Sequence, residues 1–270
     1  MNILNCFKIV PDIETMSEED IRADENLMVD TGFVKSKWNC YDESALEMLL
    51  KLSEFSEGFN VVYELNALTI GTLQCGSYLK TLYALGYKKG VCISCAQDIR
   101  FQPDMTSWLI AEYVKKEANI KVVVMGRQSE DEDSGKTPLL VAEKLQWPCI
   151  TQVIGIEADD EQHLKIYSKI GNKMLTQIIR VPVVLAIGDA PNNYLRVPTL
   201  KDRMKVIKQP IEIISAEELL EGFKAAEVSV ELISLNKINQ TRAGFMIEGD
   251  SLQAKMNKVY EEYVKQILEF

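Results

Sequence analysis

The feature that most constrains this chain is a repeated alternation between short apolar runs and longer amphipathic segments. The apolar runs are of strand length and lie at residues 3–10, 67–70, 90–94 and 122–125. Segments with helical spacing or helix-start residues follow them at 41–55, 73–85, 104–116 and 136–145. Runs that are apolar throughout are typical of strands buried on both faces. The alternation therefore predicts an α/β fold with a parallel sheet and right-handed crossovers.

The pattern changes after residue 148. Three consecutive strands are expected at 149–156, 164–170 and 174–187, with a hairpin turn at 169–172. An antiparallel annex is therefore predicted to follow the parallel core. We expect the parallel core and this annex to form one α/β domain over residues 1–189.

Residues 190–270 contain few elements able to close a core of their own. We expect a short helix capped by Ser215, with Glu218 completing a capping box, a β-prone run at 228–233 and a last helix at 251–268. This composition predicts a C-terminal arm that packs on another surface, such as that of a second subunit.

The most basic stretch of the chain lies at the start of this arm. Lys201, Arg203, Lys205 and Lys208 fall within eight residues, and Arg196 precedes them. Two interpretations stay open: a solvated segment that leads from a loop into a helix, or a docking element for an acidic partner.

Composition narrows the class of partner. The 270 residues carry a net charge of -10, with an isoelectric point near 4.9. An acidic surface repels phosphates of nucleic acids and anionic lipid heads, so we expect neither as a partner. The longest apolar runs fall short of the roughly 20 residues of a membrane span, and the first residues lack the pattern of a signal peptide. We therefore expect a cytoplasmic protein without membrane insertion.

The segment from Val122 to Glu143 carries the clearest indication of a ligand. A predicted buried strand ends at Gly126, a polar loop follows, and a helix begins near Ser134 or Thr137. Ligands of open parallel sheets bind outside the carboxyl ends of the strands, and the N–H groups of a helix start suit phosphate. The alternative is structural, because Thr137 followed by Pro138 is also a plain helix cap.

Four consecutive acids in this loop, at 130–133, argue against a phosphate site unless they point away or bind ribose hydroxyls. The loop matches neither a Walker A motif nor a GxGxxG fingerprint. Acid–base and metal constellations are missing, and the lone His163 is expected at the surface. Cys92 and Cys95 have CxxC spacing, which can serve redox chemistry, but structural thiols are the simpler interpretation. The chain is therefore predicted to be a binder or carrier.

Several segments, in this order, resemble the β subunits of electron transfer flavoproteins. Residues 6–12 (CFKIVPD) are similar to the family's C-x-K-x-V-P-D strand, and residues 39–47 (NCYDESALE) to its N-P-Y-D-E-x-A-L-E helix start. Residues 126–135 (GRQSEDEDSG) resemble the nucleotide loop G-[KR]-Q-x-x-D-x-D-x-G. Residues 196–205 (RVPTLKDRMK) resemble the recognition loop R-Y-P-S-L-x-x-I-M-K, and residues 244–250 (GFMIEGD) a motif near the end of longer members.

The resemblance implies an adenine nucleotide α-hydrolase-like, Rossmann-like fold and a set of cofactor-binding residues. These are Cys6, Asn39, Cys40, Tyr41, Asp42, Ile70, Gly126, Arg127, Gln128, Ser129, Glu130, Asp131, Glu132, Asp133, Ser134, Gly135, Lys136 and Thr137. The residues implied in docking a redox partner are Arg196, Leu200 and Met204. Glu132 stands where glycine is often found in the family, and Lys136 where glutamine is usual.

The resemblance also implies cofactors and partners. The site would hold FAD, or AMP as the alternative, and an α subunit would carry the main flavin. Together they would pass electrons from an acyl-CoA dehydrogenase-type or other redox partner to an acceptor, with bifurcation as an option if this subunit holds FAD. Two rivals remain from the residues alone: a stand-alone adenine-nucleotide-binding protein, and a redox module based on Cys92 and Cys95.

Overall fold

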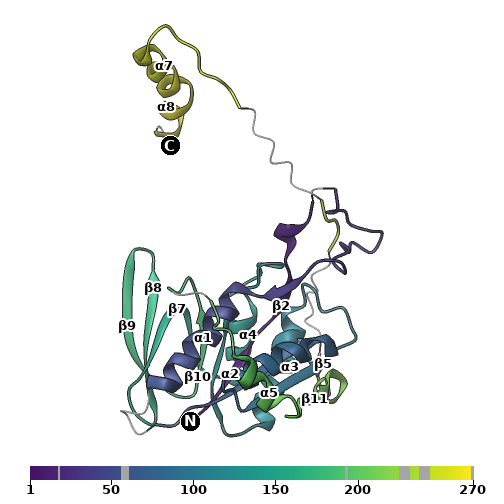
Figure 1. Cartoon of the computed structure of the whole chain (residues 1–270). Coiled ribbons are helices and arrows are strands. Elements are labelled where there is room, and N and C mark those ends of the chain that lie inside the picture. The colour runs from purple at the N-terminus through teal and green to yellow at the C-terminus, as the bar shows by residue number, and fades with distance from the viewer. Residues whose placement is uncertain (18, 56–60, 192–193, 225–231, 237–243, 269–270) are drawn as a thin grey trace. The chain divides into compact units, whose positions relative to one another are not determined.

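A computed structural model describes residues 1–17, 19–55, 61–191, 194–224, 232–236 and 244–268. The chain divides into two compact units, Met1–Ser234 and Leu235–Phe270. The first unit contains a nine-stranded sheet and a separate two-stranded one (Figure 1). The described part of the second unit contains one helical segment.

Parallel pairing dominates the large sheet, as the strand–helix alternation predicts. Its order is β11-β5-β4-β1-β6-β10-β7-β8-β9, and each neighbouring pair from β11 to β7 is parallel. The strands of this parallel part are β1 (Asn2–Cys6), β4 (Glu64–Gly71), β5 (Lys89–Ser94), β6 (Ile120–Gly126), β7 (Cys149–Ala158), β10 (Val183–Ile187) and β11 (Glu212–Ser215). The predicted α/β fold class is confirmed.

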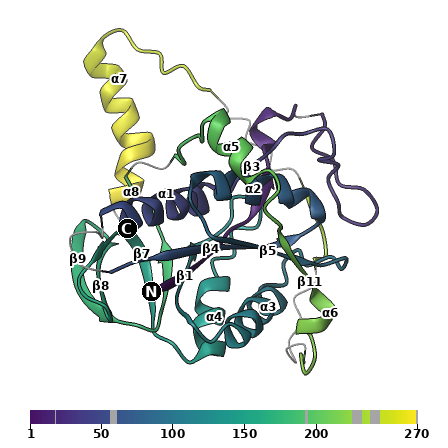
Figure 2. The ribbon, with the colours of Figure 1, turned by 60° about the horizontal axis from the view of Figure 1, so that its bottom comes forward.

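The helices cover both faces of the sheet. Helices α1 (Cys40–Phe55) and α2 (Gly76–Leu85) pack on one face, and α3 (Pro103–Lys116) and α4 (Thr137–Leu145) on the other (Figure 2). Successive residues of β1 show the division, because Ile3 belongs to the first core cluster and Leu4 to the second. Burial on both faces explains why these strands are apolar throughout. Gly86, with φ of 113°, ends α2 as predicted.

The annex differs from the prediction at its last strand. Strands β8 (His163–Ile170) and β9 (Lys173–Arg180) extend β7 by antiparallel pairing, as expected. The single strand predicted at 174–187 is wrong, because it breaks into β9 and β10 at a cis Val181–Pro182 bond. Proline has no N–H for the ladder. Strand β10 instead returns to the parallel core between β6 and β7.

The first predicted strand is also shorter than expected. It ends at Cys6, and residues 9–11 form β2 (Ile9–Pro11), which pairs with β3 (Ser36–Trp38) in the small sheet. The break occurs at Lys8, whose backbone N–H donates to the Asp42 carboxylate instead of continuing the ladder. This departure of the chain from the sheet opens space beyond the end of β1.

The region after residue 190 contributes more to the first unit than predicted. Helix α5 (Leu200–Val206) lies against α2, β11 adds an edge strand to β5, and α6 (Ala216–Leu219) packs on α3. The capping box is wrong, since the Ser215 hydroxyl bonds to Glu217 and α6 has only four residues. The β-prone run at 228–233 lies largely outside the described residues.

The last helix, predicted at 251–268, is confirmed. Helix α7 (Leu252–Val259) continues through a π-helical turn (Tyr260–Val264) into α8 (Lys265–Leu268), and the Ser251 hydroxyl caps it by accepting the Ala254 N–H. Leu252, Met256 and Tyr260 recur at four-residue spacing and are exposed. Among the described residues, the structure contains no helix with the length and apolarity needed to cross a bilayer.

Candidate functional site

A pocket of about 810 Å³, including the part open to solvent, lies beyond the carboxyl ends of β1, β4 and β6. The chain leaves β1 for β4 on one side and reaches β6 on the other, so this edge is the topological switch point where open α/β sheets bind ligands. Cys6 ends β1, Ile70 precedes the end of β4, and Gly126 ends β6. All three line the pocket, and their contact with a nucleotide stays a prediction.

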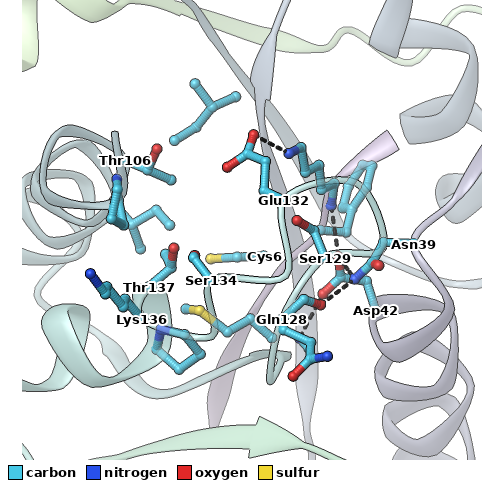
Figure 3. A pocket seen from close by; sticks show the side chains of 18 of the residues that line it. Cys6, Asn39, Asp42, Thr106, Gln128, Ser129, Glu132, Ser134, Lys136 and Thr137 are labelled. Carbon is cyan, nitrogen blue, oxygen red and sulfur yellow. Dashed lines mark hydrogen bonds and ion pairs between the residues drawn. The ribbon is translucent and has the colours of Figure 1, made fainter. Parts of the chain in front are cut away.

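A buried carboxylate joins the three segments on one side of this pocket (Figure 3). Asp42, in the first turn of α1, accepts the Gly126 N–H at 2.6 Å and the Lys8 N–H at 2.9 Å. The amide of Asn39 donates to the same carboxylate at 3.0 Å and to the Gln128 carbonyl at 2.9 Å. Both oxygens of Asp42 are thus used within the protein, so its role is to fix the loops that shape the pocket.

Burial raises the pKa of Asp42 to about 6, and the N–H groups of Lys8, Asn39 and Gly126 oppose that rise by favouring the charged form. The carboxylate is therefore the prevailing form at neutral pH. Its charge is spread over three donors, which suits a residue that orders backbone rather than one that exchanges protons with a ligand.

The acidic run is neutralised by lysines and amides from other segments. Glu130 pairs with Lys37 at 2.9 Å and accepts the Cys40 N–H at 3.0 Å. Asp131 and Glu132 both contact the Lys8 ammonium, at 2.9 Å and 2.6 Å. Asp133 accepts from the Gln128 side chain. Of these four acids, Glu132 is the one that lines the pocket, so the repulsion expected from the sequence is largely removed.

The opposite side of the pocket is rich in unused donors. Ser134, Lys136 and Thr137 line it at the start of α4, and Gly135 takes a φ of 62° that favours glycine. The N-cap position of α4 is Lys136 and has no side-chain cap. Within the described parts of the chain, the hydroxyls of Ser134 and Thr137 have no hydrogen bond and the Lys136 ammonium has no ion pair. The cap interpretation therefore does not account for these hydroxyls.

The floor and the α3 side of the pocket are apolar, and apart from Ile70 the sequence did not indicate this part. Its lining includes Leu68, Ile70, Ile99, Pro103, Ile110 and Met125. Such a wall suits a flat aromatic ring. Lys8 and Thr106 also line the pocket without having been predicted. The available clue was position, since Lys8 follows β1 and the start of α3 follows β5, at the same edge of the sheet.

The structure brings most of the predicted cofactor-binding residues to this pocket. The exceptions, which do not line it, are Cys40, Tyr41, Glu130, Asp131 and Asp133. Tyr41 stacks on the Arg127 guanidinium, 4.7 Å from its ring centroid, and accepts a hydrogen bond from it at 2.7 Å. These residues therefore stabilise the loops around the pocket and do not themselves line it.

The three predicted docking residues separate into two groups. Arg196 pairs with Glu47 at 2.8 Å and with Glu54, both on α1. Leu200 and Met204 are instead 74% and 67% exposed. With neighbouring residues of α5 and with Lys80 they line a shallow hollow. Arg196 fixes the segment, whereas the two apolar side chains are presented to solvent.

The other candidate residues of the sequence have ordinary surroundings. The described cysteines are all free thiols. Cys92 and Cys95 belong to core clusters on opposite faces of the sheet, which argues against a shared redox role. His163 is partly exposed and pairs with Asp160 at 2.9 Å.

Comparison with known proteins gives one family. Residues 27–219 match the electron transfer flavoprotein domain. YgcR of Escherichia coli, which carries a provisional name as an electron transfer flavoprotein subunit, is 27% identical over 98% of both chains. The electron transfer flavoprotein β subunits of Mus musculus and Homo sapiens are each 27% identical over 88% of this chain and 91% of theirs. Matches of this extent and consistency show that the chain belongs to the electron transfer flavoprotein family.

Proposed function

We propose that the pocket holds the adenine nucleotide part of FAD, with AMP as the alternative, and that the chain works as the β subunit of a heterodimer with an α subunit. The observation that carries this proposal is the set of unused donors at the start of α4. A helix start with a free ammonium and two free hydroxyls suits a phosphate. A bound flavin would supply the redox chemistry, and the protein supplies binding and orientation.

The fit of a nucleotide rests on chemistry distributed around the pocket. The donors of Ser134, Lys136 and Thr137 face the phosphate, and the wall from β4 and α3 receives the adenine ring. The loops between them are ordered by Asp42 and Asn39 before any ligand arrives. Preorganised donors cost little entropy on binding. The pocket therefore meets the main requirements of a nucleotide site.

A partner subunit is supported by apolar side chains that the chain leaves exposed. Tyr194 is 84% and Val197 82% exposed near α5, and Leu252 is 75% exposed on α7. Exposed apolar side chains of this size, taken separately in each of the two units, favour surfaces that bind other proteins. We propose that residues 190–270 form the recognition loop and the arm. Leu200 and Met204 would dock an acyl-CoA dehydrogenase-type or other redox partner, and the C-terminal helix would pack on the α subunit.

The test is co-expression with a candidate α subunit, followed by release and identification of the bound nucleotides. One FAD and one AMP per heterodimer would indicate a simple carrier, and two FAD would permit bifurcation. A purified complex with no nucleotide on this subunit would refute the site, and a monomer that captures no α subunit would refute the heterodimer.

Changing Ser134 and Thr137 together to alanine should lower nucleotide affinity at least about tenfold, because each hydroxyl is proposed to donate to a charged phosphate. Calorimetric titration of the heterodimer, freed of nucleotide, measures the change. The fold should survive, since neither hydroxyl bonds to another described residue.

The matched control is the pair Ser77 and Thr81 in α2, whose hydroxyls bond to the Gln74 and Ser77 carbonyls away from the pocket. Their change to alanine should leave affinity within twofold of the parent. Equal losses in both double variants would show that the effect is general and that the hydroxyls at α4 do not contact the nucleotide.

A further inference from the structure

The two sides of the pocket carry opposite charge, and Glu132 belongs to the negative side. On the α4 side, Lys136 is a cation without a partner among the described residues. On the opposite side, the single ammonium of Lys8 meets two carboxylates, those of Asp131 and Glu132. That cluster carries a net charge of about -1, while the helix start carries a positive one.

Glu132 is placed so that its charge faces the pocket. One carboxylate oxygen lies 2.6 Å from the Lys8 ammonium, and the other accepts the Phe101 N–H at 3.4 Å. Figure 3 shows the Glu132 side chain among the residues that line the pocket, with an ion pair drawn from its carboxylate. The Glu132 side chain is 19% exposed, and it lines the pocket, whereas its neighbour Asp131 does not.

These contacts leave acceptor capacity. Each carboxylate oxygen has two lone pairs, and among the described residues each oxygen of Glu132 accepts from one donor. The remaining lone pairs suit hydroxyl donors and repel anions. The Lys8 ammonium, in turn, is already engaged by two carboxylates and is a poor second site for phosphate.

We propose that Glu132 is a specificity-determining residue that accepts hydrogen bonds from the ribose hydroxyls of the nucleotide and rejects a second anionic group there. The inference rests on the proposed nucleotide site. Ribose links adenine to phosphate, and Glu132 lies in the loop just before the phosphate-binding helix start. With the phosphate at α4 and the ring on the apolar wall, the sugar faces the remaining polar lining. Two acids line the pocket, and both oxygens of Asp42 already accept N–H groups of the protein, so Glu132 is the one with lone pairs left for the sugar.

The probes are AMP and its two ribose-phosphorylated relatives, adenosine 2′,5′-bisphosphate and 3′,5′-bisphosphate. Calorimetric titration of the full-length chain in its heterodimer, freed of nucleotide, gives the three dissociation constants. The parent should bind AMP at least about tenfold more tightly than either bisphosphate, because the extra phosphate meets the Glu132 carboxylate. Glu132→Gln, which keeps the size and removes the charge, should narrow this preference about tenfold.

Asp131→Asn is the matched control, since Asp131 lies next in the same loop and pairs with the same lysine but does not line the pocket. It should change the preference less than threefold. The inference would be overturned if the preference of Glu132→Gln stayed within threefold of the parent's, or if Asp131→Asn narrowed the preference as much as Glu132→Gln does. Either result would leave the proposed function standing. A parent chain that binds no AMP and retains no FAD would overturn the proposed function and this inference with it.

Discussion

Gly126→Ala is expected to lower the free energy of unfolding by about 3 kcal/mol and to abolish nucleotide binding. A Cβ at this position would lie 2.7 Å from the Tyr41 Cβ and 2.8 Å from Asp42 Oδ1. The Tyr41 Cβ is fixed by the backbone of α1, and the Asp42 carboxylate is buried and held by its N–H donors, so neither atom can give way easily. Strand β6 must therefore move away from α1, which lengthens the 2.6 Å bond between the Gly126 N–H and Asp42. Urea unfolding and nucleotide titration measure the two effects.

Gly76→Ala is the control for the loss of a glycine as such. Gly76 begins α2, and a Cβ there would meet only the Ile211 side chain, at an ordinary 3.4 Å. Alanine favours a helix, so this variant should be unchanged or more stable by about 0.5 kcal/mol. Equal stability of the Gly126 variant and the parent would mean that the close approach of β6 and α1 is not needed for the fold.

The sequence predicted the fold class because the relevant pattern is local. Apolar runs and helical spacing are each read within about 15 residues, and the parallel sheet follows from their alternation. Strand β11 escaped prediction since it has four residues, of which Glu212 and Ile213 are exposed. Its stability comes from pairing with β5, more than 100 residues earlier, which no local pattern records.

The candidate site was predictable to the same extent and for the same reason. Gly126, the polar loop and the start of α4 are consecutive, so their meeting beyond β6 follows from one strand and one helix. The neutralisation of the acids at 130–133 could not be predicted in this way. It depends on Lys8 and Lys37, which lie more than 90 residues from the carboxylates that they contact. Charge pairing between distant segments is set by the topology of the fold. The sequence alone shows four unpaired acids at 130–133, and these argue against a phosphate site.

Arg196→Ala should lower the free energy of unfolding at pH 7 by about 2–3 kcal/mol, because Glu47 is left buried without its partner. Although burial alone would raise it, the Arg196 contacts hold the pKa of Glu47 below its ordinary value of 4.5. A carboxyl group whose pKa is lower in the folded state stabilises the fold at pH values above its pKa in the unfolded chain. This contribution is lost as the pH falls through the pKa of the folded state. The gap between parent and variant should therefore shrink from pH 7 to pH 4, as followed by urea unfolding.

Arg203→Ala removes the same side chain from the exposed surface of α5, where, among the residues that the structure describes, the guanidinium donates only to Thr81 Oγ1, at 3.5 Å. It should change stability by less than about 0.5 kcal/mol at either pH. The comparison separates two roles for the basic segment. A stability loss confined to Arg196 makes that residue the clamp that holds the segment on α1, and leaves Leu200 and Met204 to meet a redox partner. Equal stability of both variants and the parent would instead mean that the pair of Arg196 with Glu47 adds no net stability, and Arg196 would then be free for the partner.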